Sequence, residues 1–123
     1  MKLRMLTTVI VAFSCFLIGD AYAECSTVPV KFRIENNSVL TTSGATDGAP
    51  CRNVFTSKDV RYEKSVIEKQ AKNGKLEKES LTTFVYTPKK GFKGKDAYSI
   101  KMCGYSSRNE PGCVTITYEI EVK

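Results

Sequence analysis

The sequence contains no histidine and no tryptophan, and the first of these absences argues against several kinds of site. Histidine is the commonest general base in enzymes and a frequent zinc ligand. A calcium site needs clustered acids, whereas Asp47, Asp59 and Asp96 stand apart along the chain. A hydrolase is the alternative, because the sequence contains other carboxylates and the adjacent pair Lys64 and Ser65. We therefore expect a protein without a metal, a cofactor or a catalytic site.

An apolar stretch long enough to cross a bilayer is also missing. The longest such stretch is residues 6–18, whereas a membrane-spanning helix needs about 20 apolar residues. It follows the basic Lys2 and Arg4 and precedes Ala21-Tyr22-Ala23, which is the layout of a cleaved secretory signal peptide. We predict a signal peptide over residues 1–23 and a periplasmic or secreted protein. A retained membrane anchor is the alternative, and we expect no stable anchor.

The remaining residues, 24–123, have the length of one domain. The whole chain has 19 basic and 13 acidic residues. Removing Lys2, Arg4 and Asp20 leaves 17 and 12, a net charge of about +5 that is spread over the chain. Such a charge favours solubility first and acidic partners second. Nucleic acid is not an expected partner, because the protein is predicted to be exported and lacks basic residues interleaved with exposed aromatic ones.

Four cysteines remain once Cys15 is removed with the signal peptide. They are Cys25, Cys51, Cys103 and Cys113. An even number in a small exported domain indicates two disulfides. A zinc site is the alternative, but the sequence offers neither histidine nor a C-x-x-C spacing.

Alternating apolar residues predict a chain of short β-strands. Residues 28–35 alternate well, with Val28, Val30, Phe32 and Ile34 on one face, and predict a half-buried strand. A short strand over residues 39–42 and a loop over 43–50 follow.

Two more strands are predicted over residues 51–55 and 60–67. Asn73 and Gly74 have the composition of a tight hairpin turn, because both tolerate positive φ. A helix over residues 58–79 is the alternative, since this segment is rich in lysine and glutamate.

The last two strands have the clearest pattern, over residues 96–103 and 113–123. Pairing Ile100 with Ile116 in an antiparallel hairpin also places Cys103 opposite Cys113 on the polar face. Directly opposed positions bring Cβ atoms to about 4.5–5.5 Å, within which a disulfide forms at the closest sites. This register predicts Cys103–Cys113 and leaves Cys25–Cys51. A redox-active pair is the alternative for the first.

Residues 84–98 read FVYTPKKGFKGKDAY. This segment resembles the F-x-Y-x-P-x-x-G-F-x-G-x-D-x-F/Y signature of bacterial immunoglobulin-like and cadherin-like repeats of secreted and surface proteins, and the similarity extends over about residues 66–122. The resemblance implies a single immunoglobulin-like antiparallel β-sandwich of the all-β class. Antibody-type domains bury a tryptophan against a core disulfide, whereas this chain has no tryptophan and an outward-facing Cys103.

Two segments are candidate binding sites. Residues 104–112, between the paired cysteines, form an expected loop that contains Tyr105, Arg108 and Asn109, and tyrosine and arginine are enriched at binding hot spots. The turn after Pro88 contains Lys89, Lys90, Lys93 and Lys95 and suggests a patch for polyanions. An ordinary solvated hairpin tip and an ordinary Pro/Gly turn are the alternatives.

These features together predict an exported, non-catalytic binding or interaction module. Its partner is expected to be a protein or an envelope glycan. A small inhibitor of an extracytoplasmic enzyme, such as a lysozyme, is the main alternative, because a disulfide-closed loop is suited to entering a cleft.

Overall fold

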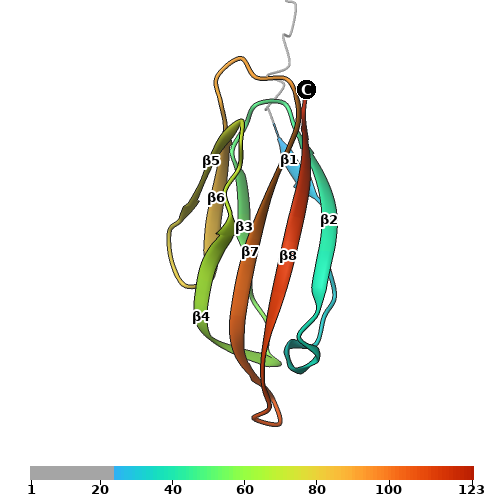
Figure 1. Cartoon of the computed structure of the whole chain (residues 1–123), viewed down its shortest axis with the longest axis vertical. Helices are drawn as coiled ribbons and strands as arrows, with labels where there is room; N and C mark the ends of the chain where they lie inside the picture. Colours follow the sequence, from blue (N-terminus) through green and yellow to red (C-terminus); the bar gives the residue numbers. More distant parts are fainter. Residues whose placement is uncertain (1–23) are drawn as a thin grey trace, which may run out of the picture.

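The computed structural model describes residues 24–123, which form two β-sheets packed face to face (Figure 1). The larger sheet has the strand order β1-β2-β8-β7-β4 and the smaller one β3-β6-β5. Their bounds are β1 (Cys25–Thr27), β2 (Val39–Thr46), β3 (Cys51–Val54), β4 (Val60–Lys69), β5 (Gly74–Lys78), β6 (Thr83–Pro88), β7 (Gly94–Ser106) and β8 (Pro111–Val122). The predicted β-sandwich is confirmed, and the predicted signal peptide lies outside the described residues.

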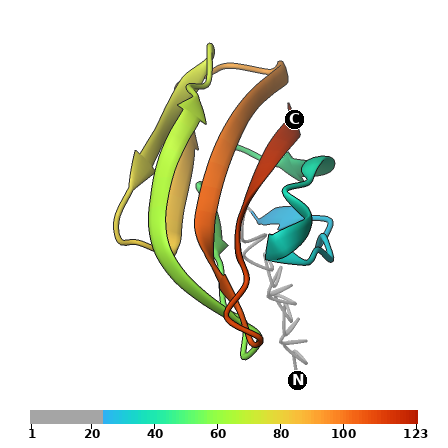
Figure 2. The same cartoon turned by 60° about the horizontal axis from the view of Figure 1, so that its bottom comes forward.

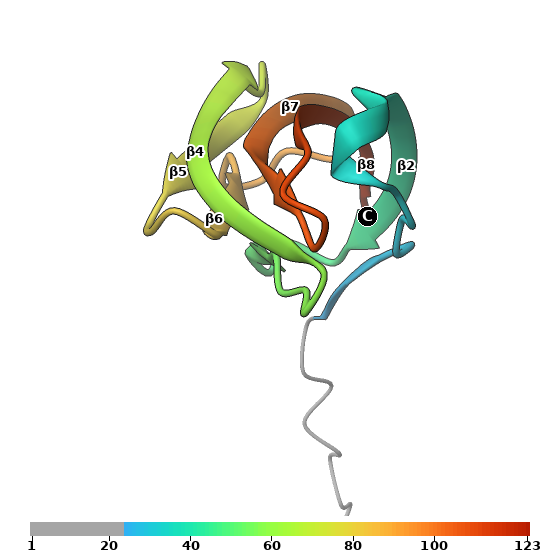
Figure 3. The ribbon, with the colours of Figure 1, turned by 90° about the horizontal axis from the view of Figure 1, so that it is seen from below.

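The core lies between the sheets and follows the alternation of the sequence. The predicted inward faces of the last two strands are confirmed, because Tyr98, Ile100 and Met102 of β7 and the even-numbered residues 114–122 of β8 are buried. The smaller sheet contributes Leu76, Phe84 and Tyr86. When the molecule is viewed along its long axis, the larger sheet curves from β4 to β2 (Figure 3).

Both predicted disulfides are present. Cys103 lies opposite Cys113 in the ladder between β7 and β8, with a Cα–Cα distance of 4.1 Å. Ile100 lies opposite Ile116, so the predicted register is confirmed. Cys25–Cys51 joins β1 of the larger sheet to β3 of the smaller sheet. Two disulfides in a small domain are consistent with an oxidising compartment. Within residues 24–123, no helix has the length and apolarity needed to span a membrane.

The strand predicted over residues 28–35 is wrong. β1 ends at Thr27, and Val28 donates the last backbone hydrogen bond to β2, at Ser43. Pro29 has no N–H with which to continue a ladder. The chain then runs along the side of the sandwich to a 3₁₀ turn, η1 (Ile34–Asn36), which packs against β8 (Figure 2). The alternation reflects this packing, since Ile34 is fully buried and Phe32 is half-buried, but Val28 is exposed.

The hairpin turn predicted at Asn73 and Gly74 is also wrong. Neither residue has a positive φ, and β4 and β5 belong to different sheets, so the segment between them crosses the sandwich. The strands predicted over 51–55 and 60–67 are confirmed by β3 and β4, and the alternative helix over 58–79 is therefore wrong.

β2 extends through Thr46 into the region predicted as a loop, because it pairs along its whole length with β8. This pair is parallel, and the other strand pairs are antiparallel.

The aromatic, glycine and aspartate residues of the motif over residues 84–98 have structural roles. Phe84, Tyr86 and Tyr98 are buried, and Phe92 packs against the core. Gly91 and Gly94 have φ values of 81° and 138°, in the region that favours glycine.

Asp96, the acidic residue of the motif, is 7% exposed. Its carboxylate accepts hydrogen bonds from the backbone N–H groups of Lys72 and Asn73, each at 3.1 Å, and from the Tyr86 hydroxyl at 2.8 Å. It therefore fastens the crossing segment between β4 and β5 to strands of both sheets.

Candidate functional site

The hairpin of β7 and β8 ends in a short exposed tip at one end of the molecule (Figure 1). The loop predicted over residues 104–112 is smaller than expected, because both strands continue past the disulfide and Tyr105 lies opposite Pro111 in the ladder. Residues 107–110 alone form the turn, and all four are exposed. The apolar alternation stops at the disulfide because the strands leave the core there, while backbone pairing continues.

Hydrogen bonds within the turn fix the conformation of the tip. The Ser106 hydroxyl accepts from the backbone N–H groups of Arg108 at 3.3 Å and Glu110 at 3.1 Å. Asn109 has a φ of 62° and donates its N–H to the Ser106 carbonyl at 2.8 Å. Asparagine tolerates this left-handed conformation better than most residues. The tip is thus ordered by its own polar groups as well as by the disulfide below it.

Arg61 of β4 braces the tip from the side. Its guanidinium carbon lies 4.8 Å from the centroid of the Tyr105 ring, and its Nη2 donates to Asn109 Oδ1 at 3.3 Å. The sequence pattern did not reveal this residue, because the pairing of β4 with β7 is not marked by any local motif. Tyr105 and Asn109 therefore support the tip, whereas Arg108 extends from it without an ion pair to another residue of 24–123.

The base of the tip is fixed by close backbone packing. A Cβ atom on Gly112 would overlap the carbonyl of Ile34, and one on Gly104 would overlap the carbonyl of Arg61. The amide of Cys113 donates to Asn37 Oδ1 at 2.9 Å. Both strands of the hairpin are therefore held by neighbouring segments, η1 on one side and β4 on the other.

The predicted basic turn lies at the opposite end of the molecule from the tip (Figure 1). Lys89, Lys90, Lys93 and Lys95 are all exposed there, and none of them forms an ion pair with a described residue. The turn is held by the Lys89 N–H, which donates to the Asn73 carbonyl at 2.9 Å.

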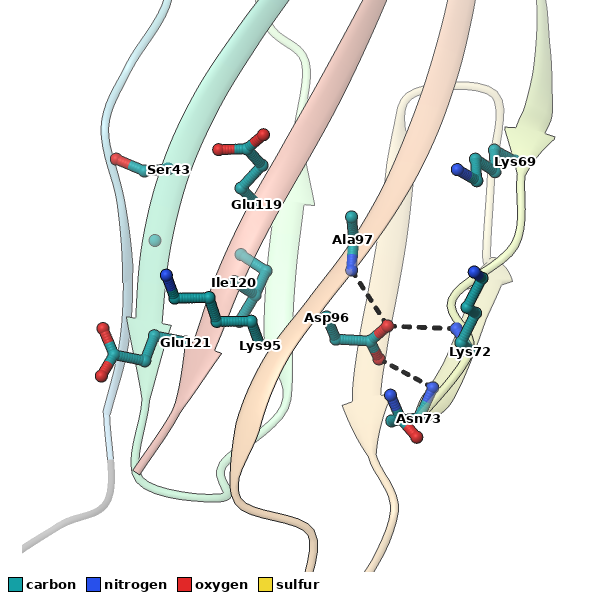
Figure 4. Close-up of a pocket in the computed structure, with 11 residues that line it drawn as sticks. Ser43, Lys69, Lys72, Asn73, Lys95, Asp96, Ala97, Glu119, Ile120 and Glu121 are labelled. Atoms are coloured by element: carbon teal, nitrogen blue, oxygen red, sulfur yellow. Dashed lines mark hydrogen bonds between the residues drawn. The ribbon is translucent and has the colours of Figure 1, made fainter.

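A depression on the outer face of the larger sheet adjoins this turn (Figure 4). Its lining includes Lys69, Lys72 and Lys95 together with Glu119 and Glu121. Lys95 lies directly opposite Glu121 in the ladder. Asp96 reaches this depression from below, but its oxygens are occupied by the hydrogen bonds drawn in Figure 4 and by Tyr86. The surface is of mixed charge, so the lysines do not form an uninterrupted cationic patch.

The described residues contain no group of three or more acidic, cysteine or histidine side chains that could hold a metal ion.

The buried tyrosines are ordered by packing. Burial raises the pKa of the Tyr98 hydroxyl to about 12, and Tyr98 stacks on Tyr118 at 5.1 Å between ring centroids. Burial also raises the pKa values of Tyr86 and Tyr118 well above the ordinary value for tyrosine.

No protein-family model and no curated protein matches this chain.

Proposed function

We propose that the protein is an exported, non-catalytic binding module of the immunoglobulin-like type, and that it contacts a protein partner through the tip of the β7–β8 hairpin. The observation that carries the proposal is the rigid construction of a tip that contributes nothing to the core. A disulfide, an arginine brace and hydrogen bonds to Ser106 all order exposed residues.

This construction lowers the entropic cost of binding. Ordering a rotamer-rich side chain or a loop at an interface costs about 0.5–1.5 kcal/mol for each immobilised side chain. In this tip the backbone is already ordered, and Tyr105 is already packed against Arg61. Binding then requires mainly that Arg108 be ordered. Export is supported by the two disulfides and by the predicted signal peptide, and the motif over residues 84–98 supports the immunoglobulin-like assignment.

An inhibitor of an extracytoplasmic enzyme is the second candidate, and the same tip favours it. The projecting part is a two-stranded ribbon with a four-residue turn, residues 107–110, which is narrow enough to enter a cleft. The partner would then be a hydrolase of the envelope. A binding module of either kind is expected to have no catalytic activity of its own.

Site-specific crosslinking tests the contact. A photoreactive amino acid replaces Arg108 in the tip or, as a matched control, Glu119 on the outer face of the larger sheet. Both positions are exposed, and neither contributes to the core. After expression of the full chain and irradiation of the intact envelope, a discrete crosslinked product is expected from position 108 and not from position 119.

The purified crosslinked partner then allows binding to be measured. Arg108→Ala should weaken affinity by about tenfold or more, as expected for an arginine at a hot spot. Lys90→Ala, an exposed cation in the turn at the opposite end of the molecule, should leave it unchanged. Equal products from both crosslinking positions, or unchanged affinity in a folded Arg108→Ala variant, would contradict the proposal.

A further inference from the structure

A groove of about 610 Å³ opens on the side of the sandwich, between the segment after β1 and strand β3. One wall is residues 27–32, and the other is residues 52–57. The volume lies within the range of about 300–1,000 Å³ that is typical of ligand pockets. Two of the exposed large apolar side chains of the described chain, Val28 and Val54, line it at 58% and 53% exposure. This groove is separate from the hairpin tip.

The floor of the groove is aromatic and includes two tyrosine hydroxyl groups. The Phe55 ring meets Tyr62 edge to face, with ring centroids 6.4 Å apart. Tyr118 lines the same groove from β8, and its hydroxyl forms no hydrogen bond to any residue of 24–123. The Tyr62 hydroxyl has no such partner either. Among residues 24–123 the fully buried side-chain polar atom without a partner is Ser65 Oγ, so both tyrosine hydroxyls reach solvent in the groove and are free to bond a polar group of a ligand.

The wall formed by β3 is the free edge of the smaller sheet. The Phe55 N–H donates to the Thr82 carbonyl at 2.8 Å, so Phe55 is at a hydrogen-bonded position of the ladder with β6. Because such positions alternate along an antiparallel pair, the backbone groups of Arg52 and Val54 point away from β6. None of them hydrogen-bonds to a residue in the described part of the chain. β3 stands at the end of the order β3-β6-β5 and pairs with β6 on its other side, so this edge is open to a further strand.

The charged residues around the groove favour a bound segment of opposite charge. Its charged lining residues are Lys31 and Arg52, and it includes no carboxylate. Arg52 is already paired with Glu79, at 2.6 Å, whereas Lys31 forms no ion pair with another residue of 24–123. An acidic residue in the bound segment would therefore be favoured beside Lys31.

We propose that this groove binds an extended peptide segment of a partner protein, which adds to β3 as a fourth strand of the smaller sheet. One apolar side chain of the segment lies on Phe55, Tyr62 and Tyr118, and an acidic side chain lies next to Lys31. The main-chain hydrogen bonds at Arg52 and Val54 supply affinity, and the aromatic floor supplies specificity, as in other cases of strand addition.

Selection from a random octapeptide library displayed on phage tests the proposal. The target is the protein expressed as the full chain, with both disulfides formed. Enriched peptides should contain an acidic residue next to an apolar one. In a backbone NMR titration with a synthetic enriched peptide, the amides of Arg52 and Val54 should shift and become protected from exchange.

Two variants with a matched control separate strand addition from other binding. Val54→Pro removes an outward N–H and leaves the ladder with β6 intact, since proline is tolerated at sheet edges. It should weaken peptide binding by at least about tenfold, whereas Val54→Thr should not, because main-chain bonds dominate this mode. Lys31→Glu on the flanking segment should weaken acidic peptides by about two- to fivefold.

Three outcomes would overturn the proposal. The first is a selection that enriches no peptide, and the second is binding that Val54→Pro and Lys31→Glu both leave unchanged. The third is concentration-dependent dimerisation that shifts the Arg52 and Val54 amides without peptide, which would assign the groove to a second copy of this chain.

Discussion

The carboxylate of Asp96 offers the sharpest test of how the two sheets are joined. Asp96→Ala removes the acceptor of three bonds to other segments, which come from the backbone of Lys72 and Asn73 and from the Tyr86 hydroxyl. The site is buried, so water replaces these bonds poorly. At about 1 kcal/mol for each lost bond, the free energy of unfolding should fall by about 3 kcal/mol. For a domain of this size, about 4–8 °C is lost for each kcal/mol, so the melting temperature should fall by about 12–24 °C.

Graded variants separate this effect from a general loss of packing. Tyr86→Phe removes one of the three bonds and should cost about 1 kcal/mol. Asp96→Asn should lie between the two, because one amide oxygen still accepts while the NH₂ group faces donors. Glu119→Ala, an exposed acid in the same depression, should change stability by less than about 0.5 kcal/mol.

Urea denaturation followed by circular dichroism measures these differences, and hydrogen exchange locates them. The amides of Lys72 and Asn73 should be protected in the parent protein and exchange rapidly in Asp96→Ala. A cost for Asp96→Ala no larger than that for Tyr86→Phe would refute the reasoning, as would unchanged exchange at these two amides.

Three further predictions concern the hairpin and the core. Replacing Cys103 and Cys113 together by serine should lower the free energy of unfolding by about 2–3 kcal/mol, since a loop of about ten residues loses its covalent closure; the midpoint of urea denaturation measures this, and an unchanged midpoint would contradict it. Gly112→Ala should lower the free energy of unfolding by about 1–3 kcal/mol, because the added Cβ would overlap the Ile34 carbonyl and push η1 from β8. Thermal unfolding with the same midpoint as the parent would disprove this close contact. The domain should lose stability between about pH 10 and pH 12, because burial of Tyr98 favours the folded state only while its hydroxyl stays protonated. Tyrosinate absorbance at alkaline pH should rise together with unfolding. Ionisation of all tyrosines before any unfolding would argue against this prediction.

The sequence alone determined which faces of the last two strands lie in the core. Their residues alternate strictly, and a slip of one position would turn every apolar side chain of β8 outward. The same register placed Cys103 opposite Cys113, so one disulfide and, by exclusion, the other could be predicted. The absence of histidine and the position of the cysteines likewise needed no structure.

Which segments lie next to one another could not be predicted from the sequence pattern. Residues 28–35 alternate as well as a true strand does, but the pairing with β2 ends at Val28, because Pro29 has no N–H and the chain turns toward η1. Asn73 and Gly74 have hairpin chemistry, yet the chain crosses to the other sheet there. The brace of Arg61 on the tip and the groove beside β3 both join residues far apart in sequence.

The physical reason is that side-chain alternation and backbone pairing carry different information. Alternation records which side of a strand faces the core, so it can be read from the sequence. Every strand presents the same N–H and C=O groups along its edges, so the choice of neighbour depends on how the whole chain packs. The edge of β3 that is left open, and with it the proposed peptide groove, is therefore a property of the folded protein.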